Sequence, residues 1–376
     1  MQLIDSSAGL AAAERALNGA TRLFVDTEFE SNRQGKLLCL VQVSQGQQVF
    51  VIDTLRLQNL AKLARVFGRA GIEWVLHAGS QDIELLVDRL GVRPERIFDT
   101  QIAWALLGPE HSVSLPYLVY RLLGVRLRKG YQADDWKRRP LPADQLAYAC
   151  ADIEYLPALH ASLSQRLEQL GRLEAVFDAS REAAWPEPEP ALPLRLDAFR
   201  NAWQLDRGSQ AALRFLVDWY NALSPEEQTR APETKTLLSI AARLPANADE
   251  LARIKGVPRR WAADHGEHLT AQLARASTEA DNSGFNPAEP PSYASYDEIR
   301  LEAWLGLARA ELCAELSVAP ELALPQRILR RMRDAILKSR DIAAGASALV
   351  GWRERLLATS FEAYCRRAPP TLAAPV

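Results

Sequence analysis

The sequence contains few residues of the types that bind zinc or form disulfides. Its 376 residues include four cysteines, at positions 39, 150, 313 and 365, and five histidines. No two cysteines are close enough for a Cys-x-x-Cys zinc or redox motif, and a chain of this length needs no disulfide framework. We therefore expect four free thiols in a reducing compartment, and we assign a metal-ligating role to none of His77, His111 and His160.

Long hydrophobic runs and an excess of charge of either sign are also missing. No apolar run approaches the roughly 18 residues of a membrane span, and no basic stretch precedes an apolar run near Met1. We therefore predict a cytoplasmic protein without a membrane partner. With 45 basic and 47 acidic residues the formal net charge is −2, so contacts with nucleic acid must come from local basic patches. We expect no nucleotide cofactor. The sequence also has no Walker A loop ending in Gly-Lys-Ser/Thr, which disfavours a helicase setting.

Two stretches rich in proline and small polar residues divide the chain. They are WPEPEPALP at 185–193 and a Ser-, Asn- and Pro-rich stretch at 277–295. Closely spaced prolines prevent a continuous helix, so both stretches are predicted linkers. At roughly 150 residues per domain, the length also predicts more than one domain. We therefore expect domains at 1–184, 195–276 and 297–367.

The first domain alternates strand and helix signals. Three runs rich in β-branched and aromatic residues predict an antiparallel meander. They are RLFVDTEFE (22–30), LLCLVQVS (37–44) and QVFVID (48–53). A helical pattern at 57–71, a strand at 74–79 and a helix from an N-cap at Ser80 to Gly91 follow, and the rest is predicted mostly helical. This order predicts an α/β domain with a mixed sheet, and the two later domains are predicted all-α.

The residues that indicate function are acidic. Asp26 and Glu28 lie two apart in a predicted strand, so both side chains leave the same face. Asp82 lies in the first turn of the helix after HAGS, and Tyr148 and Asp152 lie four apart on one face of a later helix. Each has an ordinary explanation when taken singly, such as a favourable charge at a helix N-terminus. If these three elements converge, four carboxylates meet in one pocket. Another acid, Asp99 in FDTQ, is predicted to cap a helix.

Four converging carboxylates repel one another unless cations neutralise them. Oxygen ligands without His or Cys suit Mg²⁺ or Mn²⁺ rather than zinc. Two such ions about 4 Å apart form the clamp used for in-line phosphoryl displacement. We therefore predict a site for two divalent metal ions, Mg²⁺ or Mn²⁺.

Five motifs, in this order along the chain, carry a resemblance to a known family. They are VDTEFE (25–30), HAGSQDIELL (77–86), FDTQIA (98–103), DWKRRPL (135–141) and QLAYACADIEYL (145–156). On these motifs the first domain resembles the Tyr-containing branch of the DEDD exonuclease superfamily and, within it, the bacterial ribonuclease D family. AWQLD (202–206), LLSIA (237–241) and IKGVP (254–258) resemble the first of the tandem HRDC domains of that family. The implied fold is a ribonuclease H-like mixed-sheet exonuclease domain followed by two all-α HRDC-like domains, the second degenerate.

The resemblance also implies roles for five residues. Asp26, Glu28 and Asp152 would hold the metal that activates water, and Asp26 and Asp82 would hold the second metal near the leaving oxygen. Tyr148 would orient the attacking water. The implied reaction releases nucleoside 5′-monophosphates one at a time from the 3′ end. Since the metal lowers the pKa of its water, no dedicated histidine base is required.

Two basic stretches predict where RNA binds. Residues 126–139 hold six basic and two acidic residues with interleaved aromatics, and residues 327–340 hold six basic residues and one acidic residue. Basic charge tracks phosphates and aromatic rings stack unpaired bases, which suits a single-stranded 3′ end. The alternatives are a solvated loop whose Trp136 packs on the domain, and a solvated helix face. The predicted RNA-binding residues are Arg128, Lys129, Tyr131, Trp136, Arg139, Arg330, Arg331 and Arg333.

The predicted function is that of a metal-dependent 3′→5′ exoribonuclease, acting as a monomer on tRNA precursors and other small stable RNAs. Two alternatives stay open. A 3′→5′ DNA exonuclease would use the same pocket. A non-catalytic RNA-binding protein would be marked by the loss of a metal ligand, yet all four carboxylates and the tyrosine are present.

Overall fold

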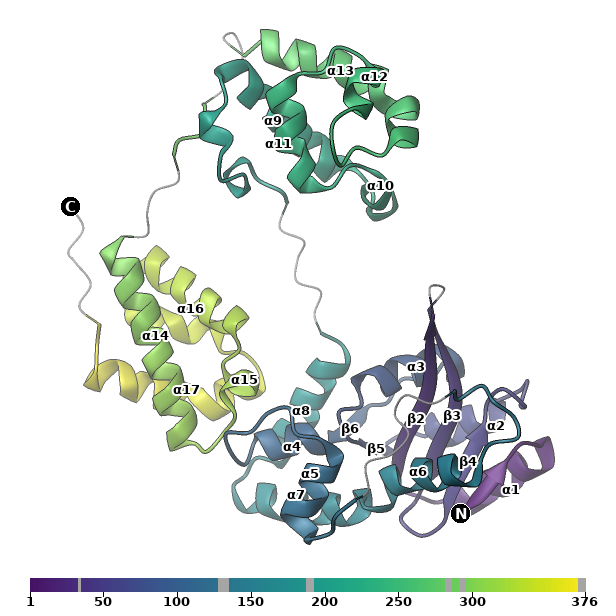
Figure 1. Cartoon of the computed structure of the whole chain (residues 1–376). Coiled ribbons are helices and arrows are strands. Elements are labelled where there is room, and N and C mark those ends of the chain that lie inside the picture. The colour runs from purple at the N-terminus through teal and green to yellow at the C-terminus, as the bar shows by residue number, and fades with distance from the viewer. Residues whose placement is uncertain (33–34, 128–134, 187–192, 281–285, 291–294, 371–376) are drawn as a thin grey trace. The chain divides into compact units, whose positions relative to one another are not determined.

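The chain forms two compact units, which are described separately (Figure 1). A computed structural model describes residues 1–32, 35–127, 135–186, 193–280, 286–290 and 295–370. One unit joins Met1–Glu187 with Tyr296–Val376, and the other is Pro188–Ser295. The three domain boundaries expected from the sequence stay a prediction.

A six-stranded mixed sheet lies at the centre of the first unit, in the order β1-β4-β3-β2-β5-β6. The pairs β2–β3 and β3–β4 are antiparallel, and the other three pairs are parallel. The strands are β1 (Gln2–Ile4), β2 (Arg22–Asn32), β3 (Gly35–Ser44), β4 (Val49–Asp53), β5 (Glu73–Leu76) and β6 (Arg96–Asp99). The predicted meander and mixed sheet are confirmed. Strands β1 and β6, of three and four residues, are not predicted from the sequence, whereas the equally short β5 is predicted as the strand at 74–79.

Helices pack around this sheet. They are α1 (Ser7–Leu17), α2 (Ala61–Phe67), α3 (Ser80–Leu90), α4 (Thr100–Ala105), α5 (Leu115–Leu123), α6 (Ala143–Glu154), α7 (Leu156–Gln169) and α8 (Leu173–Ala184). As predicted, α3 ends at Gly91, which has φ +67°, a conformation that glycine adopts without strain. The predicted N-cap at Ser80 is wrong by one position, because Ser80 is the first helical residue and Gly79 precedes it.

Alternate residues of β2 point into two different cores. Leu23 and Val25 pack in a cluster that includes α1, α2 and α3 residues, whereas Phe24 packs with residues of α4, α5, α7 and α8. This alternation is the period-two pattern of a strand. Asp26 and Glu28 continue the face of Phe24, and α6 packs on β2, β3 and β4. The two carboxylates of β2 are therefore directed toward the side of the sheet that α6 covers.

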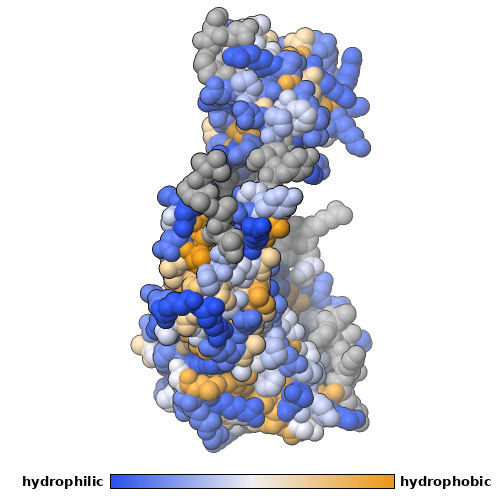
Figure 2. Space-filling view, turned by 90° about the vertical axis from the view of Figure 1, so that its left-hand side faces the viewer, coloured by the Kyte–Doolittle hydropathy of each residue, from blue (hydrophilic) through white to orange (hydrophobic). Residues whose placement is uncertain are grey.

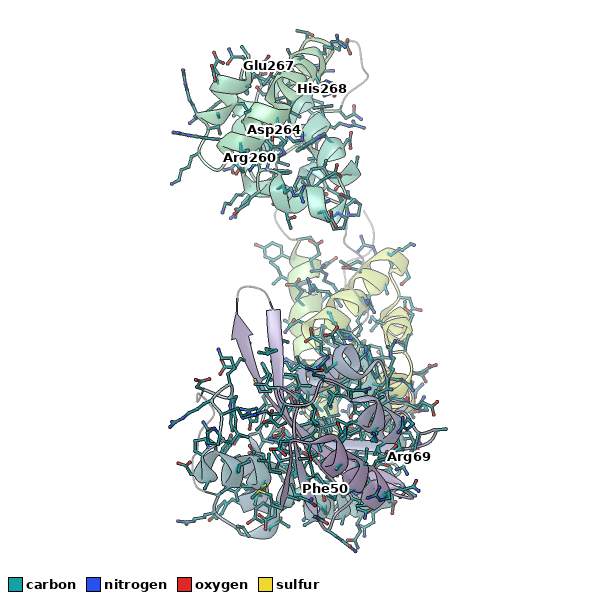
Figure 3. All side chains as sticks on the ribbon, turned by 90° about the vertical axis from the view of Figure 1, so that its right-hand side faces the viewer. Phe50, Arg69, Arg260, Asp264, Glu267 and His268 are labelled. Carbon is teal, nitrogen blue, oxygen red and sulfur yellow. The ribbon has the colours of Figure 1, made fainter. Side chains whose placement is uncertain are left out.

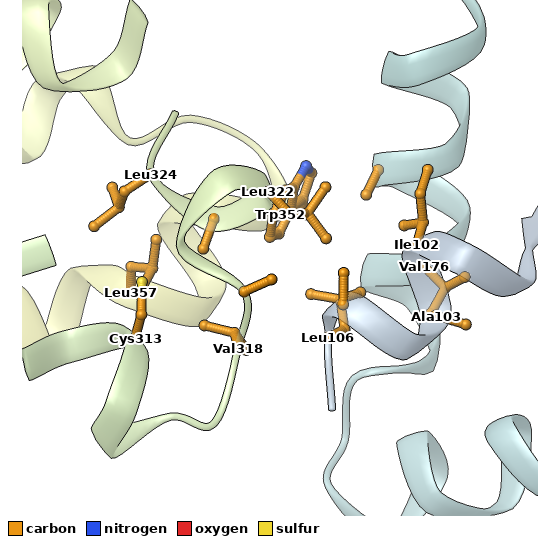
Figure 4. Close-up of a cluster of buried hydrophobic side chains, with 14 of the residues drawn as sticks. Ile102, Ala103, Leu106, Val176, Cys313, Val318, Leu322, Leu324, Trp352 and Leu357 are labelled. Atoms are coloured by element: carbon orange, nitrogen blue, oxygen red, sulfur yellow. The ribbon is translucent and has the colours of Figure 1, made fainter. Parts of the chain in front are cut away.

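The C-terminal helices of the first unit pack against α4 and α8 (Figure 4). They are α14 (Tyr296–Glu315), α15 (Pro320–Ala323), α16 (Gln326–Ser339), η3 (Ile342–Ala348) and α17 (Trp352–Arg367). The apolar part of the contact joins Ile102 and Leu106 to Leu322 and Trp352. The backbone amide of Ala319 also donates to the Ala105 carbonyl at 2.7 Å.

A carboxylate anchors the same contact. Glu182 of α8 accepts hydrogen bonds from Arg353 Nη1 at 2.5 Å and Trp352 Nε1 at 3.0 Å, and it also pairs with Arg327. The Arg353 side chain is only 5% exposed. Arg353 also donates to the Leu322 and Ala323 carbonyls, so the buried guanidinium is well satisfied.

The described residues of the second unit form helices and loops around an apolar core of their own. Its elements are η1 (Leu196–Ala198), η2 (Ala202–Gln204), α9 (Arg207–Ala222), α10 (Pro225–Arg230), α11 (Thr234–Arg243), α12 (Ala248–Ala252) and α13 (Arg259–Thr278). On the side of α13 that faces away from this core lie the exposed residues Arg260, Asp264, Glu267 and His268 (Figure 3). Their helical spacing, with Leu269 and Leu273 in the core, makes α13 amphipathic.

The helices of the described ranges lack the combination of length and apolar character that a membrane span requires. On the face drawn in Figure 2, hydrophilic residues are interspersed with smaller groups of apolar ones.

Candidate active site

Three carboxylates from two distant parts of the chain meet between β2 and α6. Asp26, Glu28 and Asp152 each offer a carboxylate oxygen, and these oxygens lie within 4.8 Å of one another. The strand period brings the first two to one face, and α6 places Asp152 above them. The convergence that the sequence analysis expects of these three residues is present in the structure.

Asp82 lies beside this cluster, in the first turn of α3. Its carboxylate accepts a hydrogen bond from the Thr27 hydroxyl, and Thr27 lies between Asp26 and Glu28. Among the neighbouring charges, Asp82 has the largest effect on the pKa of Asp26. The fourth predicted carboxylate is therefore close enough to act electrostatically on the cluster.

Burial raises the pKa values of all four acids, and repulsion within the cluster adds to the rise at Asp26 and Glu28. Burial raises the pKa of Glu28 to about 9, with further contributions from Asp152 and Asp82. Burial, followed by the charges of Asp82, Asp152 and Glu28, raises the pKa of Asp26 well above its usual value. Burial also raises the pKa of Asp152 to about 6 and that of Asp82, although hydrogen bonds from Tyr148 and Thr27 oppose these two shifts.

A divalent cation fits this donor set. The clustered ligand atoms are all carboxylate oxygens, which hard cations such as Mg²⁺ and Mn²⁺ prefer. Without a cation the four acids are not all ionised at neutral pH, because the pKa of Glu28 is raised to about 9. A bound cation would offset the repulsion that the protein has built into this site.

Tyr148 lies one helical turn before Asp152 on α6, as its spacing predicts. Its hydroxyl hydrogen-bonds the Asp152 carboxylate. Its ring lies beside Trp136, with ring centroids 6.3 Å apart. The hydroxyl is thus held at the edge of the carboxylate cluster.

Asp99 has a second task that the sequence analysis does not find. As predicted, it caps α4, where its Oδ1 accepts from the Gln101 amide at 2.8 Å. The same carboxylate accepts from the amides of Ala78 at 3.0 Å and Gly79 at 2.9 Å, in the turn that leads into α3. Asp99 therefore ties the helix of Asp82 to the end of β6. The only sequence signal for this role is the motif FDTQ itself.

Two of the predicted RNA-binding residues are buried or internally paired. Trp136 is 2% exposed, so its ring cannot stack on a base, and the alternative of a Trp136 that packs on the domain is correct. The Arg139 side chain is 12% exposed and forms a bidentate ion pair with Asp53. Arg128, Lys129 and Tyr131 lie outside the described residues.

The basic helix α16 is partly used in ion pairs. Arg333 pairs with Glu302 at 2.8 Å and with Asp334 at 2.9 Å, so its predicted availability to RNA is reduced. Arg330 and Arg331 are exposed. These two arginines therefore keep the position expected of an RNA-binding surface.

Comparison with known proteins defines the class. A family model described as a 3′-5′ exonuclease matches residues 1–168, and a model described as an HRDC domain matches residues 230–273. The mixed sheet and the carboxylate cluster lie in the first of these matches. The first part of the chain is thus a ribonuclease H-like 3′-5′ exonuclease domain.

Full-length relatives define the family. Ribonuclease D of Granulibacter bethesdensis is 31% identical over 359 residues, which cover 93% of this chain and 89% of the relative. Ribonuclease D of Escherichia coli is 31% identical over 284 residues, 74% of this chain and 75% of the relative. The crystal structure of the Escherichia coli enzyme, described as an exoribonuclease involved in structured RNA processing, matches with a TM-score of 0.69 and 27% identity, covering 98% of this chain and 99% of that one. The chain belongs to the ribonuclease D family and is a hydrolytic 3′→5′ exoribonuclease.

Proposed function

We propose that this exoribonuclease uses two divalent metal ions, Mg²⁺ or Mn²⁺, held by Asp26, Glu28, Asp82 and Asp152. It shortens RNA from a single-stranded 3′ end and releases nucleoside 5′-monophosphates. The observation that carries the proposal is the cluster of carboxylate oxygens within 4.8 Å of one another, all from acids with raised pKa values.

When bound, the metal ions would supply positive charge to the scissile phosphate and a water of lowered pKa. Asp26, Glu28 and Asp152 would hold one metal, and Asp26 and Asp82 would hold the other. Tyr148 orients the water through its hydroxyl, which is already held by Asp152. No histidine is assigned to proton transfer, because water of lowered pKa needs no strong base.

The proposed substrates are tRNA precursors and other small stable RNAs. The description of the Escherichia coli relative as an enzyme of structured RNA processing supports a folded RNA. Arg330 and Arg331 of α16 supply exposed positive charge for the body of such an RNA. The second helical segment, 297–367, is proposed to be a degenerate HRDC-like domain that carries this charge. We also propose a monomer in the reducing cytoplasm, where Cys39, Cys150, Cys313 and Cys365 stay unpaired, as they are in the structure.

A gel time course with 5′-labelled single-stranded RNA and the matching DNA tests the catalytic proposal. Each is incubated with Mg²⁺ or Mn²⁺, with chelator, and with Asp152→Ala. We expect a ladder that shortens from the 3′ end of RNA, is abolished by chelator, and is slowed about a thousandfold by the substitution, since a metal ligand supports several kcal/mol of transition-state stabilisation. Glu154→Gln is the matched control, because Glu154 is an exposed acid on the same helix.

The outcomes separate the remaining alternatives. If DNA is shortened as fast as RNA or faster, the alternative of a 3′→5′ DNA exonuclease is favoured. RNA binding without shortening of either strand would favour a non-catalytic protein. Activity that persists in chelator would contradict the metal site itself.

A further inference from the structure

The loop that carries DWKRRPL is attached to the sheet at two points. At one end, the backbone amide of Trp136 donates to Glu30 Oε1 of β2 at 3.0 Å. At the other end, Arg139 donates to Asp53, the last residue of β4, through Nε at 2.5 Å and Nη2 at 2.8 Å. We call Glu30, Asp53, Trp136 and Arg139 the brace.

The Arg139–Asp53 pair is buried and saturated with hydrogen bonds. Arg139 Nη1 also donates to the carbonyls of Trp136 at 2.7 Å and Arg138 at 2.8 Å. Asp53 is 2% exposed, and its Oδ1 also accepts from the amides of Leu55 and Arg56. Only the planar, forked guanidinium can make the bidentate pair and the carbonyl contacts together. Arg139 thus closes the loop onto the sheet and has little of its side chain left for a phosphate.

The brace holds the Trp136 side chain between the sheet and α6. Its ring packs in one cluster with Leu40 of β3, Val51 of β4 and Ala149 of α6. On the α6 side it lies beside the ring of Tyr148, at 6.3 Å between centroids and 35° between planes. The hydroxyl of the Tyr148 ring is hydrogen-bonded to the Asp152 carboxylate. A shift of the indole would therefore be transmitted to the tyrosine hydroxyl.

We propose that Arg139 and Asp53 are positioning residues for Tyr148: their ion pair fixes Trp136, and Trp136 fixes the ring whose hydroxyl orients the attacking water. This inference rests on the proposed role of Tyr148. It gives Arg139 a task that differs from the RNA contact that its basic neighbours suggest. The two tasks make opposite predictions for kinetics.

The test compares Arg139→Lys, Arg139→Gln and Asp53→Asn in the full-length protein, with single-stranded RNA and saturating Mg²⁺. We expect kcat to fall about tenfold to a hundredfold, because small misplacement of a catalytic group has effects of that size. KM for RNA should stay unchanged. Arg139→Lys should fail to restore kcat, since lysine keeps the charge but loses the fork. Arg56→Gln, an exposed arginine close to Asp53, is the matched control.

A double-mutant cycle assigns the effect to Tyr148. In a Tyr148→Phe background the hydroxyl is already absent, so Arg139→Lys and Asp53→Asn should lower kcat little further. An undiminished second loss would overturn the proposal, because the pair would then act on the metal ligands or the fold. A raised KM that Arg139→Lys restores, with unchanged kcat, would also overturn it and would make Arg139 an RNA contact.

Thermal melting separates positioning from folding. If Arg139→Gln does not fold, Arg139→Lys and Trp136→Phe carry the same comparison. If the wild type is active and kcat is unchanged in every folded variant of the brace, the positioning role is contradicted while the proposed function stands. A wild type that shortens no RNA contradicts the proposed function, and the brace inference falls with it.

Discussion

Glu28 and Asp152 are held in the folded protein in a state that favours their protonated forms. The pKa of Glu28 is raised to about 9 and that of Asp152 to about 6, in both cases chiefly by burial. An acid whose pKa is higher in the folded than in the unfolded state stabilises the fold at low pH, and this stability is lost as pH rises. As pH rises these acids ionise, so the repulsion within the site increases and its ability to bind a cation increases with it.

This electrostatic strain predicts how pH affects the metal-free protein. In chelator, the contribution of these two acids to the free energy of unfolding should be fully present below about pH 4, their pKa in the unfolded chain. It should be lost as pH rises through about 6 and on toward 9, the pKa values of Asp152 and Glu28 in the folded protein. Mg²⁺ should restore stability mainly at the upper end of this range, because binding releases the protons. Urea unfolding at several pH values measures both. A metal-free stability that rises between pH 6 and 9 would contradict the raised pKa values.

A single neutral substitution should separate stability from activity. Asp26 is buried beside three other carboxylates that raise its pKa, so Asp26→Asn should stabilise the metal-free protein at pH 8. The same change should remove the stabilisation by Mg²⁺ and slow RNA shortening about a thousandfold. Thermal melting with and without Mg²⁺ and the gel assay report the two effects. Asp88→Asn, at an exposed position of α3, is the control. A destabilised Asp26→Asn protein that still responds to Mg²⁺ would contradict this account.

At the scale of elements, the orientation of α3 depends on the turn before it. Asp99 accepts three backbone hydrogen bonds, two of them from this turn. Ala78 in the turn has φ +53°, which is unfavourable for a residue with a side chain. A Cβ on Gly79 would lie 2.5 Å from Leu76 Cβ, so the turn has no room for an alanine. The carboxylate of Asp99 is what keeps this strained turn in place.

We therefore expect Asp99→Asn to destabilise the protein by about 1–3 kcal/mol, since an amide nitrogen would face a buried backbone donor. Because α3 carries Asp82, the affinity for Mn²⁺ should fall as well. Urea unfolding and Mn²⁺ titration measure the two effects. Glu84→Gln, at an exposed position of the same helix, should change neither by much. Unchanged metal affinity in a destabilised Asp99→Asn protein would show that the turn does not position Asp82.

The sequence predicts those parts of the site whose signals are local. Asp26 and Glu28 share a strand face, and Tyr148 and Asp152 share a helix face, so spacing alone pairs them. The roles of Trp136 and Arg139 could not be found in this way. The partner of Arg139 is Asp53, 86 positions earlier, and a run of basic residues looks the same whether it binds phosphate or pairs inside the fold. The four-residue strand β6 is likewise identified only in the structure, where it pairs in parallel with β5.

At the scale of the whole molecule, the C-terminal helices are part of the unit that contains the nuclease site. Glu182 of α8 joins Arg353, Trp352 and Arg327, which follow it by about 145 to 171 positions. On the same helix, the Ser180 hydroxyl accepts from the Asp99 amide at 3.1 Å. The docked helices are thus connected through α8 and Asp99 to the turn that leads to Asp82.

Removing one member of this ion-pair cluster should destabilise the whole first unit. Arg353→Met leaves Glu182 with Arg327 and Trp352, but it removes the hydrogen bonds to the Leu322 and Ala323 carbonyls. We expect a loss of about 3 kcal/mol, as for other broken buried pairs. Arg355→Met removes an exposed ion pair with Asp178 and should cost far less. Chemical denaturation compares the two, and equal losses would contradict the importance of burial here.

The same contact decides how RNA binding by α16 can be tested. A chain that ends at residue 190 loses α14 to α17, exposes Ile102 and Leu106, and leaves Glu182 without its partners. We expect it to aggregate or melt at lower temperature and to lose activity even on short single-stranded RNA, so lost RNA binding could not be attributed to the basic helix.

Arg330→Gln with Arg331→Gln removes the exposed charge of α16 and keeps the contact between the C-terminal helices and α8. The double variant should leave the melting temperature and the kcat on short RNA unchanged, and it should raise KM for a folded RNA with a 3′ tail. The slope of the logarithm of the binding constant against the logarithm of the salt concentration should become shallower by about 2, because two phosphate contacts are lost. An unchanged salt dependence would show that the body of the RNA is held elsewhere, whereas a truncated chain with full activity on short RNA would show that the nuclease fold does not need the docked helices.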